Sequence, residues 1–155
     1  MEQRHLERAI EVAEEGMLQG LGGPFGALIV RGDSVLAEAS NRVTSSHDPT
    51  AHAEIVAIRA ACQLVGDFSL AGCEIYSSCE PCPMCLSAIH WARLDRLYFA
   101  ASRSDAAAIG FDDELLYVEL GRSAAERRLP TARALEDQAR GMMMRWLAMP
   151  PERRY

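Results

Sequence analysis

The sequence reads His52-Ala53-Glu54 and, further along, Pro81-Cys82-Pro83-Met84-Cys85. One histidine and two cysteines can bind a zinc ion and leave its fourth position open for water, whereas structural zinc usually has four protein ligands. A glutamate beside that water can move protons to and from it. We therefore interpret His52, Cys82 and Cys85 as the ligands of one Zn²⁺ per chain, and Glu54 as the catalytic proton shuttle.

The spacing of these residues predicts that they lie at the starts of two helices. Cys82 and Cys85 are three residues apart, so on a helix that begins near Cys82 they share one face of the first turn. The positive end of the helix dipole favours the thiolate there, and the thiolate is the form that binds metal. Asp48 is expected to cap the other helix, which runs from about Thr50 to Leu64 and carries His52. Glu54 then points away from His52, so we do not interpret it as a fourth ligand.

The pattern of apolar residues predicts the remaining elements. Apolar residues at helical spacing indicate a helix over about Glu2–Gln19. Short apolar runs bounded by turn residues predict four strands, at Gly26–Val30, Val35–Ala39, Glu74–Ser78 and Arg96–Ala101. Further helices are expected near 82–93, Ser104–Ala108 and Thr131–Met149. Helices that alternate with strands indicate an α/β fold with a sheet between helical layers, and the hairpin at its start makes that sheet mixed.

The bulk composition limits the class of protein. A chain of 155 residues, 49% apolar and 25% charged, is typical of one compact domain. The formal charge of −6 argues against nucleic acid as a partner, because phosphate contacts need an excess of Lys and Arg. No apolar run reaches the length of a signal peptide or a membrane span. Five cysteines, two of them at a metal spacing, favour reduced thiols and a cytoplasmic location over disulfides.

The paired motifs H-x-E and P-C-x-x-C resemble those of the cytidine deaminase-like superfamily. Within it the chain is similar to the small bacterial guanine deaminases over nearly its whole length. The resemblance rests on Gly23–Ala27, Asn41, Asp48–Glu54, Ser78–Cys85, Gly110–Asp113 and the terminal Tyr155. It implies a three-layer α/β/α cytidine deaminase-like fold with a central mixed sheet of about five strands. It also implies a single domain, residues 1–155, that hydrolyses guanine to xanthine and ammonia.

The same resemblance implies which residues bind the purine base. Phe25 would pack against the ring, Asn41 would hydrogen-bond the base, and Ala53 would contribute to the same site. Asp113 would face the edge that carries the leaving amino group, which makes it both a substrate-binding and a catalytic residue. Tyr155 would close the pocket.

The resemblance further implies a homodimer in which the C-terminal segment, about 131–155, is exchanged between subunits. Tyr155 would then enter the pocket of the other subunit. The methionine-rich face of the last helix suits either a core or such an exchanged interface.

Three alternatives remain open. Guanosine and other amino-heterocycles are substrates that the residues do not separate from guanine. A tRNA adenosine deaminase shares the fold and the zinc motif, but those enzymes are typically basic, lack a Gly-Phe-Asp-Asp loop, and usually have Val in place of Phe25. A zinc-stabilised interaction domain would need no proton shuttle, and Glu54 is present.

Overall fold

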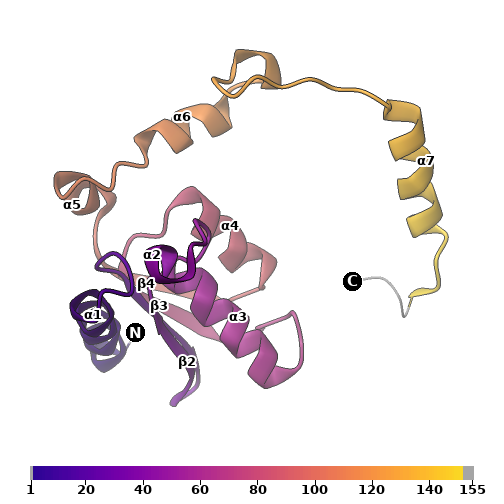
Figure 1. The fold of residues 1–155 in the computed structure, drawn as a ribbon. Helices are drawn as coiled ribbons and strands as arrows, with labels where there is room; N and C mark the ends of the chain where they lie inside the picture. Colours follow the sequence, from indigo (N-terminus) through magenta and orange to yellow (C-terminus); the bar gives the residue numbers. More distant parts are fainter. Residues whose placement is uncertain (1, 152–155) are drawn as a thin grey trace. The chain divides into compact units, whose positions relative to one another are not determined.

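The computed structural model describes residues 2–151 and contains a β-sheet between two helical layers. In Figure 1, helix α1 (Gln3–Leu18) covers one face of the sheet, and helix α3 (Ala53–Val65) covers the other together with α4 (Pro83–Trp91). The three-layer α/β/α arrangement that the sequence predicted is confirmed.

Four strands form the sheet within residues 2–151, in the order β2 (Ser34–Ser40), β1 (Gly26–Arg31), β3 (Glu74–Cys79) and β4 (Arg96–Ala101). Strand β1 is antiparallel to both of its neighbours, whereas β3 and β4 are parallel, so the sheet is mixed. The four strands lie where the apolar runs predicted them.

The expectation of about five strands is wrong for this part of the chain. No further strand follows β4, and the chain forms helix α5 (Arg103–Ala108), close to the helix expected near Ser104–Ala108. Ser102 caps this helix through a reciprocal pair of hydrogen bonds with Asp105, which satisfies the free N–H groups of its first turn and favours helix over strand.

Alternating side chains on the central strands divide the core between the two faces. Ala27 and Ile29 pack with residues of α3 and α4, whereas Leu28 and Val30 pack with residues of α1. The period of two follows from the pleat of a strand, which sends successive side chains to opposite faces. The face that carries Ile29 is the one against which both zinc-ligand helices pack.

Gly26 allows α1 to approach β1 closely. A Cβ at this position would overlap the backbone of Ala9 and Ala13 on α1. A glycine is therefore required where the first layer meets the sheet.

Helix α3 begins later than the sequence predicted. Asp48 does not cap it; its Oδ1 instead accepts hydrogen bonds from the backbone N–H and the hydroxyl of Thr50, at 2.8 Å and 2.7 Å. This is a local Asx turn, and it ends in extended backbone at His52, the N-cap residue of α3. A short helix, α2 (Val43–Ser46), precedes this turn.

The chain divides into two compact units, Met1–Tyr117 and Val118–Tyr155. Helix α6 (Glu114–Gly121) spans the boundary, and the second unit also contains a 3-10 turn at Ala124–Glu126 and helix α7 (Glu136–Leu147). Helix α7 is shorter than the predicted 131–149, because its N-cap residue Leu135 has a φ of 57°, outside the helical region. Among the described helices, none has both the length and the apolar character needed to cross a bilayer.

Candidate metal centre and active site

Three side chains from the two helix starts converge on one point. The Nδ1 atom of His52 lies 3.6 Å from Sγ of Cys82 and 3.5 Å from Sγ of Cys85. His52 and Cys82 are the N-cap residues of α3 and α4, and both have extended backbone, with ψ of 154° and 168°. Pro83 follows at the first helical position of α4, where its missing N–H costs nothing. The donor atoms of all three residues lie within 4.8 Å of one another.

The electrostatics of this cluster favour metal binding. Hydrogen bonds from the thiol of Cys85 and from the ring of His52 lower the pKa of Cys82 to about 4, so Cys82 is a thiolate at neutral pH. Cys85 keeps the proton that it donates to Cys82, and this hydrogen bond raises the pKa of Cys85. A thiolate, a second thiol and an imidazole in contact form the ligand set that zinc prefers, and three protein ligands leave a fourth position open. The residues therefore fit one Zn²⁺.

Glu54 lies beside this cluster but outside it. Its side chain is buried, with 6% of the residue exposed, and it lines the same pocket as His52 and Cys82. Burial raises the pKa of Glu54, because the charged carboxylate is poorly solvated there. A buried carboxyl group with a raised pKa can both accept and return a proton near neutral pH.

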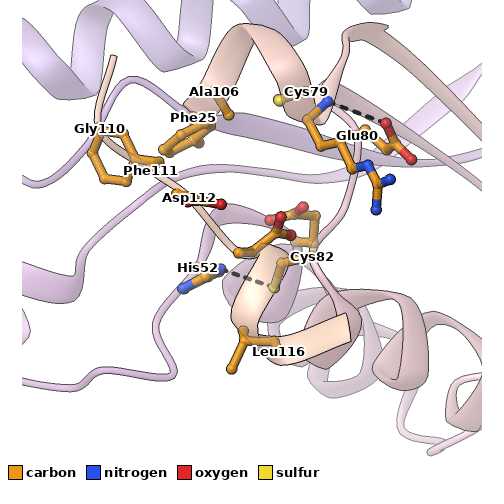
Figure 2. A pocket seen from close by; sticks show the side chains of 13 residues that line it. Phe25, His52, Cys79, Glu80, Cys82, Ala106, Gly110, Phe111, Asp112 and Leu116 are labelled. Carbon is orange, nitrogen blue, oxygen red and sulfur yellow. Dashed lines mark hydrogen bonds between the residues drawn. The ribbon is translucent and has the colours of Figure 1, made fainter. Parts of the chain in front are cut away.

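The pocket has a volume of about 270 Å³ and one aromatic wall (Figure 2). The rings of Phe25 and Phe111 meet edge to face, with centroids 4.9 Å apart. Phe25 directly precedes β1, and Phe111 comes from the loop between α5 and α6. The lining residues are Phe25, His52, Glu54, Cys79, Glu80, Cys82, Arg103, Ala106, Gly110, Phe111, Asp112, Asp113 and Leu116. An apolar wall facing several charged groups suits a flat, polar-edged ring.

The two aspartates of the Gly-Phe-Asp-Asp loop have different roles in the structure. Asp112 Oδ1 accepts a hydrogen bond of 3.0 Å from the backbone N–H of Glu114, so it supports the start of α6. Asp113 is half-buried, and desolvation together with the nearby Cys82 raises its pKa. A carboxyl group with a raised pKa in a pocket, as at Asp113, is typical of a functional site.

Some of the predicted purine-binding residues lie outside this lining. Asn41 is buried, and its Oδ1 already accepts hydrogen bonds from the N–H groups of Gly23 and Val43, at 3.3 Å and 3.1 Å. Ala53, the first residue of α3, is fully buried in the core. Tyr155 lies outside the described residues. The structure therefore brings Phe25 and Asp113 to the zinc ligands, whereas Asn41 and Ala53 are not among the residues that line the pocket.

Sequence reasoning gave no role to several residues that line the pocket, among them Phe111, Glu80, Arg103 and Leu116. Phe111 belongs to the Gly110–Asp113 motif, but the sequence does not show that its ring contacts Phe25. Arg103 comes from helix α5, and Leu116 comes from the first turn of α6. The pattern Ser102-x-x-Asp105 is a capping-box signal that could have located α5 more sharply.

The chain is similar to known proteins over this site and beyond it. A family model described as the cytidine and deoxycytidylate deaminase zinc-binding region matches residues 1–101. A guanine deaminase from Bacillus subtilis (strain 168) is 53% identical over 125 residues, which are 81% of this chain and 80% of that protein. A solved X-ray structure of guanine deaminase from Bacillus subtilis is 44% identical and has a TM-score of 0.96, covering 100% of this chain and 99% of that one.

The similarity to tRNA-editing enzymes is shorter. A tRNA-specific adenosine deaminase from Agrobacterium fabrum is 43% identical over 86 residues, which are 56% of this chain and 57% of that protein.

Proposed function

Because the chain belongs to the cytidine and deoxycytidylate deaminase family, we propose that it is a zinc-dependent aminohydrolase that converts guanine and water to xanthine and ammonia. The observation that carries this proposal is the convergence of His52, Cys82 and Cys85 beside the buried Glu54. The match to a guanine deaminase structure over the whole chain supports guanine as the substrate.

His52, Cys82 and Cys85 would hold the zinc ion, which would supply a water whose pKa is lowered toward about 7 as the nucleophile. Glu54 accepts the proton of the attacking water, whose oxygen forms a bond to C2 of guanine. Glu54 delivers this proton to ring nitrogen N3, then takes the remaining proton of the added hydroxyl group and delivers it to the amino group. The C2–N bond breaks, ammonia leaves, and the ring becomes xanthine.

The pocket residues suit recognition of the base. Phe25 and Phe111 offer apolar ring surface to the face of guanine, and Asp113 meets the edge that bears the leaving amino group. The Asn41 oxygen is already engaged by backbone N–H groups, so we expect only the amide nitrogen of Asn41 to donate to the base. Ala53 supports this site from the first turn of α3, and Tyr155 completes the pocket.

Glu54→Gln tests the proton shuttle directly. We expect kcat on guanine to fall by about 10²–10⁴-fold, because the amide cannot carry a proton, while the protein keeps its zinc. Glu7→Gln on the exposed side of α1 is the matched control, with unchanged turnover. Zinc content by metal analysis and xanthine formation by absorbance are the two measurements. Near-wild-type turnover by zinc-loaded Glu54→Gln would refute the assignment.

The substrate is tested by running guanine beside guanosine, adenosine, cytosine and a tRNA, with and without a zinc chelator. We expect zinc-dependent loss of guanine alone. The net charge of −6 argues against tRNA, because the negative charge repels the phosphate backbone. Turnover of the nucleoside or of another amino-heterocycle in place of guanine would support the alternative small-molecule substrates. The reduced thiols that zinc binding needs support a cytoplasmic location.

We also propose one deaminase domain per chain and a homodimer that exchanges residues 131–155. Helix α7 supports this, because its large apolar side chains are 41–63% exposed: Met142, Met143, Met144, Trp146 and Leu147. An apolar surface of this extent is typical of a helix that packs against another chain.

Subunit complementation tests the exchange. Glu54→Gln and a chain ending at residue 151 are each expected to be inactive. Co-expressed, they form mixed dimers in which one pocket combines an intact Glu54 with Tyr155 of the partner subunit, so about a quarter of all sites regain activity. A monomer in light scattering, or no recovered activity, would contradict the exchange.

A further inference from the structure

The segment after β4, residues 102–117, is attached at its start to the loop that leads to the zinc ligand Cys82. The backbone N–H of Glu80 donates to the carbonyl oxygen of Ala101 at 2.8 Å. The Glu80 carboxylate in turn accepts a hydrogen bond of 3.1 Å from the backbone N–H of Arg103. Glu80 directly precedes Pro81 and the ligand Cys82, so the start of α5 is fixed to the zinc loop.

The side chain of Arg103 then reaches the start of α6. Its Cζ lies 4.7 Å from the centroid of the Tyr117 ring, within the range of a cation–π contact. Its guanidinium also lies 3.8 Å from the carboxylate of Glu114. The loop Gly110–Asp113 lies between α5 and α6, and Arg103, the first residue of α5, therefore joins the start of α5 to the first turn of α6.

Asp113 belongs to the part of the chain that Arg103 holds. Its carbonyl oxygen accepts hydrogen bonds from the N–H groups of Leu116 and Tyr117, at 2.8 Å and 3.4 Å. Tyr117 and Asp113 thus share one helical turn, and a shift of the Tyr117 ring would move Asp113 with it. Arg103 and Asp113 also line the same pocket, in which Arg103 carries the one guanidinium among the described lining residues.

We propose that Arg103 is a positioning residue for the deamination. Its backbone is fixed to the zinc loop by Glu80, and its side chain holds Tyr117 and Glu114 so that Asp113 faces the base. This inference rests on the proposed function, because it concerns the placement of Asp113 against guanine. The chemical step is unusually sensitive to such placement, since a displacement of about 1 Å can cost about 100-fold in rate.

The test compares four zinc-loaded full-length variants with wild type: Arg103→Met, Arg103→Lys, Tyr117→Leu and the double variant Arg103→Met/Tyr117→Leu. The matched control is Arg93→Met, which removes an equivalent contact of 4.8 Å between a guanidinium and the Phe68 ring, outside the pocket lining. The measurements are kcat and KM on guanine, zinc content and Tm.

We expect Arg103→Met to lower kcat about tenfold while KM changes less, because a misplaced Asp113 impairs the reaction more than base binding. Tyr117→Leu lowers kcat by a similar factor. The double variant lowers kcat no further than either single variant, because both substitutions remove the same contact. Arg103→Lys retains part of the rate, since it keeps the charge beside Glu114 but loses the flat stacking surface. Arg93→Met keeps the wild-type kcat.

Different results refute different statements. An Arg103→Met kcat within twofold of wild type refutes the inference, as do losses that multiply in the double variant or an equal loss in Arg93→Met. If Arg103→Met does not fold, Arg103→Lys and Tyr117→Leu decide, and wild-type kcat in both refutes the inference. An inert zinc-loaded wild type instead refutes the proposed function, and the role of Arg103 with it.

Discussion

Because the core is divided between the two faces of the sheet, cavities of equal size on opposite faces should have unequal effects on the affinity for zinc. Ile75 and Leu28 are both fully buried on central strands. Ile75 packs with residues of α3 and α4, which carry the zinc ligands, whereas Leu28 packs with residues of α1. Ile75→Ala and Leu28→Ala should each lower the free energy of unfolding of the zinc-free protein by about 3 kcal/mol. For a chain of this length, that corresponds to a decrease of about 6–12 °C in Tm.

With zinc present, the two variants should diverge. A cavity beneath α3 and α4 lets their N-termini, which carry the zinc ligands, shift. Loss of the residues that hold metal ligands in place typically weakens metal binding by about tenfold. At saturating zinc, this weaker binding lowers the free energy of unfolding of Ile75→Ala by a further ~1.4 kcal/mol. Leu28→Ala keeps the wild-type affinity for zinc. Thermal melting with and without zinc, and titration against a competing chelator, measure both effects. Equal zinc affinity in the two variants would refute the reasoning, as would weaker binding in Leu28→Ala.

Three further predictions concern single contacts. Gly26→Ala should lower the free energy of unfolding by about 1–3 kcal/mol, because its Cβ overlaps the backbone of α1; an unchanged Tm would contradict this. The Arg8 hydrogen bond lowers the pKa of Glu38, so the ionised pair stabilises the fold above the ordinary Glu pKa of 4.5 and loses this effect as the pH falls through the lowered value. Glu38→Gln should therefore lower the free energy of unfolding by under about 1 kcal/mol at pH 7, since the pair is partly exposed. At strongly acidic pH the substitution should have no effect. Urea unfolding at the two pH values distinguishes this result from a loss that does not depend on pH. Phe111→Leu removes the edge-to-face contact with Phe25, worth about 0.5–1.5 kcal/mol, so KM for guanine should rise about 2–10-fold with zinc content unchanged; a wild-type KM would exclude Phe111 from the base-binding wall.

The sequence by itself determined the metal chemistry and the position of each strand. His52, Cys82 and Cys85 are identifiable because few residue types bind zinc, and their spacing is set by the geometry of a helix turn. Strands β1 to β4 are identifiable because alternation and turn residues are local features, read within a window of a few residues. Glu54 could be distinguished from the zinc ligands by its spacing of two residues from His52, which is also a local feature.

Only the tertiary structure decided what faces the zinc site. The edge-to-face pair of Phe25 and Phe111 and the bond between Glu80 and Arg103 join residues far apart in the chain. The oxygen of Asn41 proved to be engaged by backbone N–H groups, which no residue pattern shows. The resemblance implied a sheet of about five strands, whereas four form within the described residues. Such contacts depend on how the layers pack, and packing is a property of the whole folded chain, whereas propensity and ligand spacing are properties of short segments.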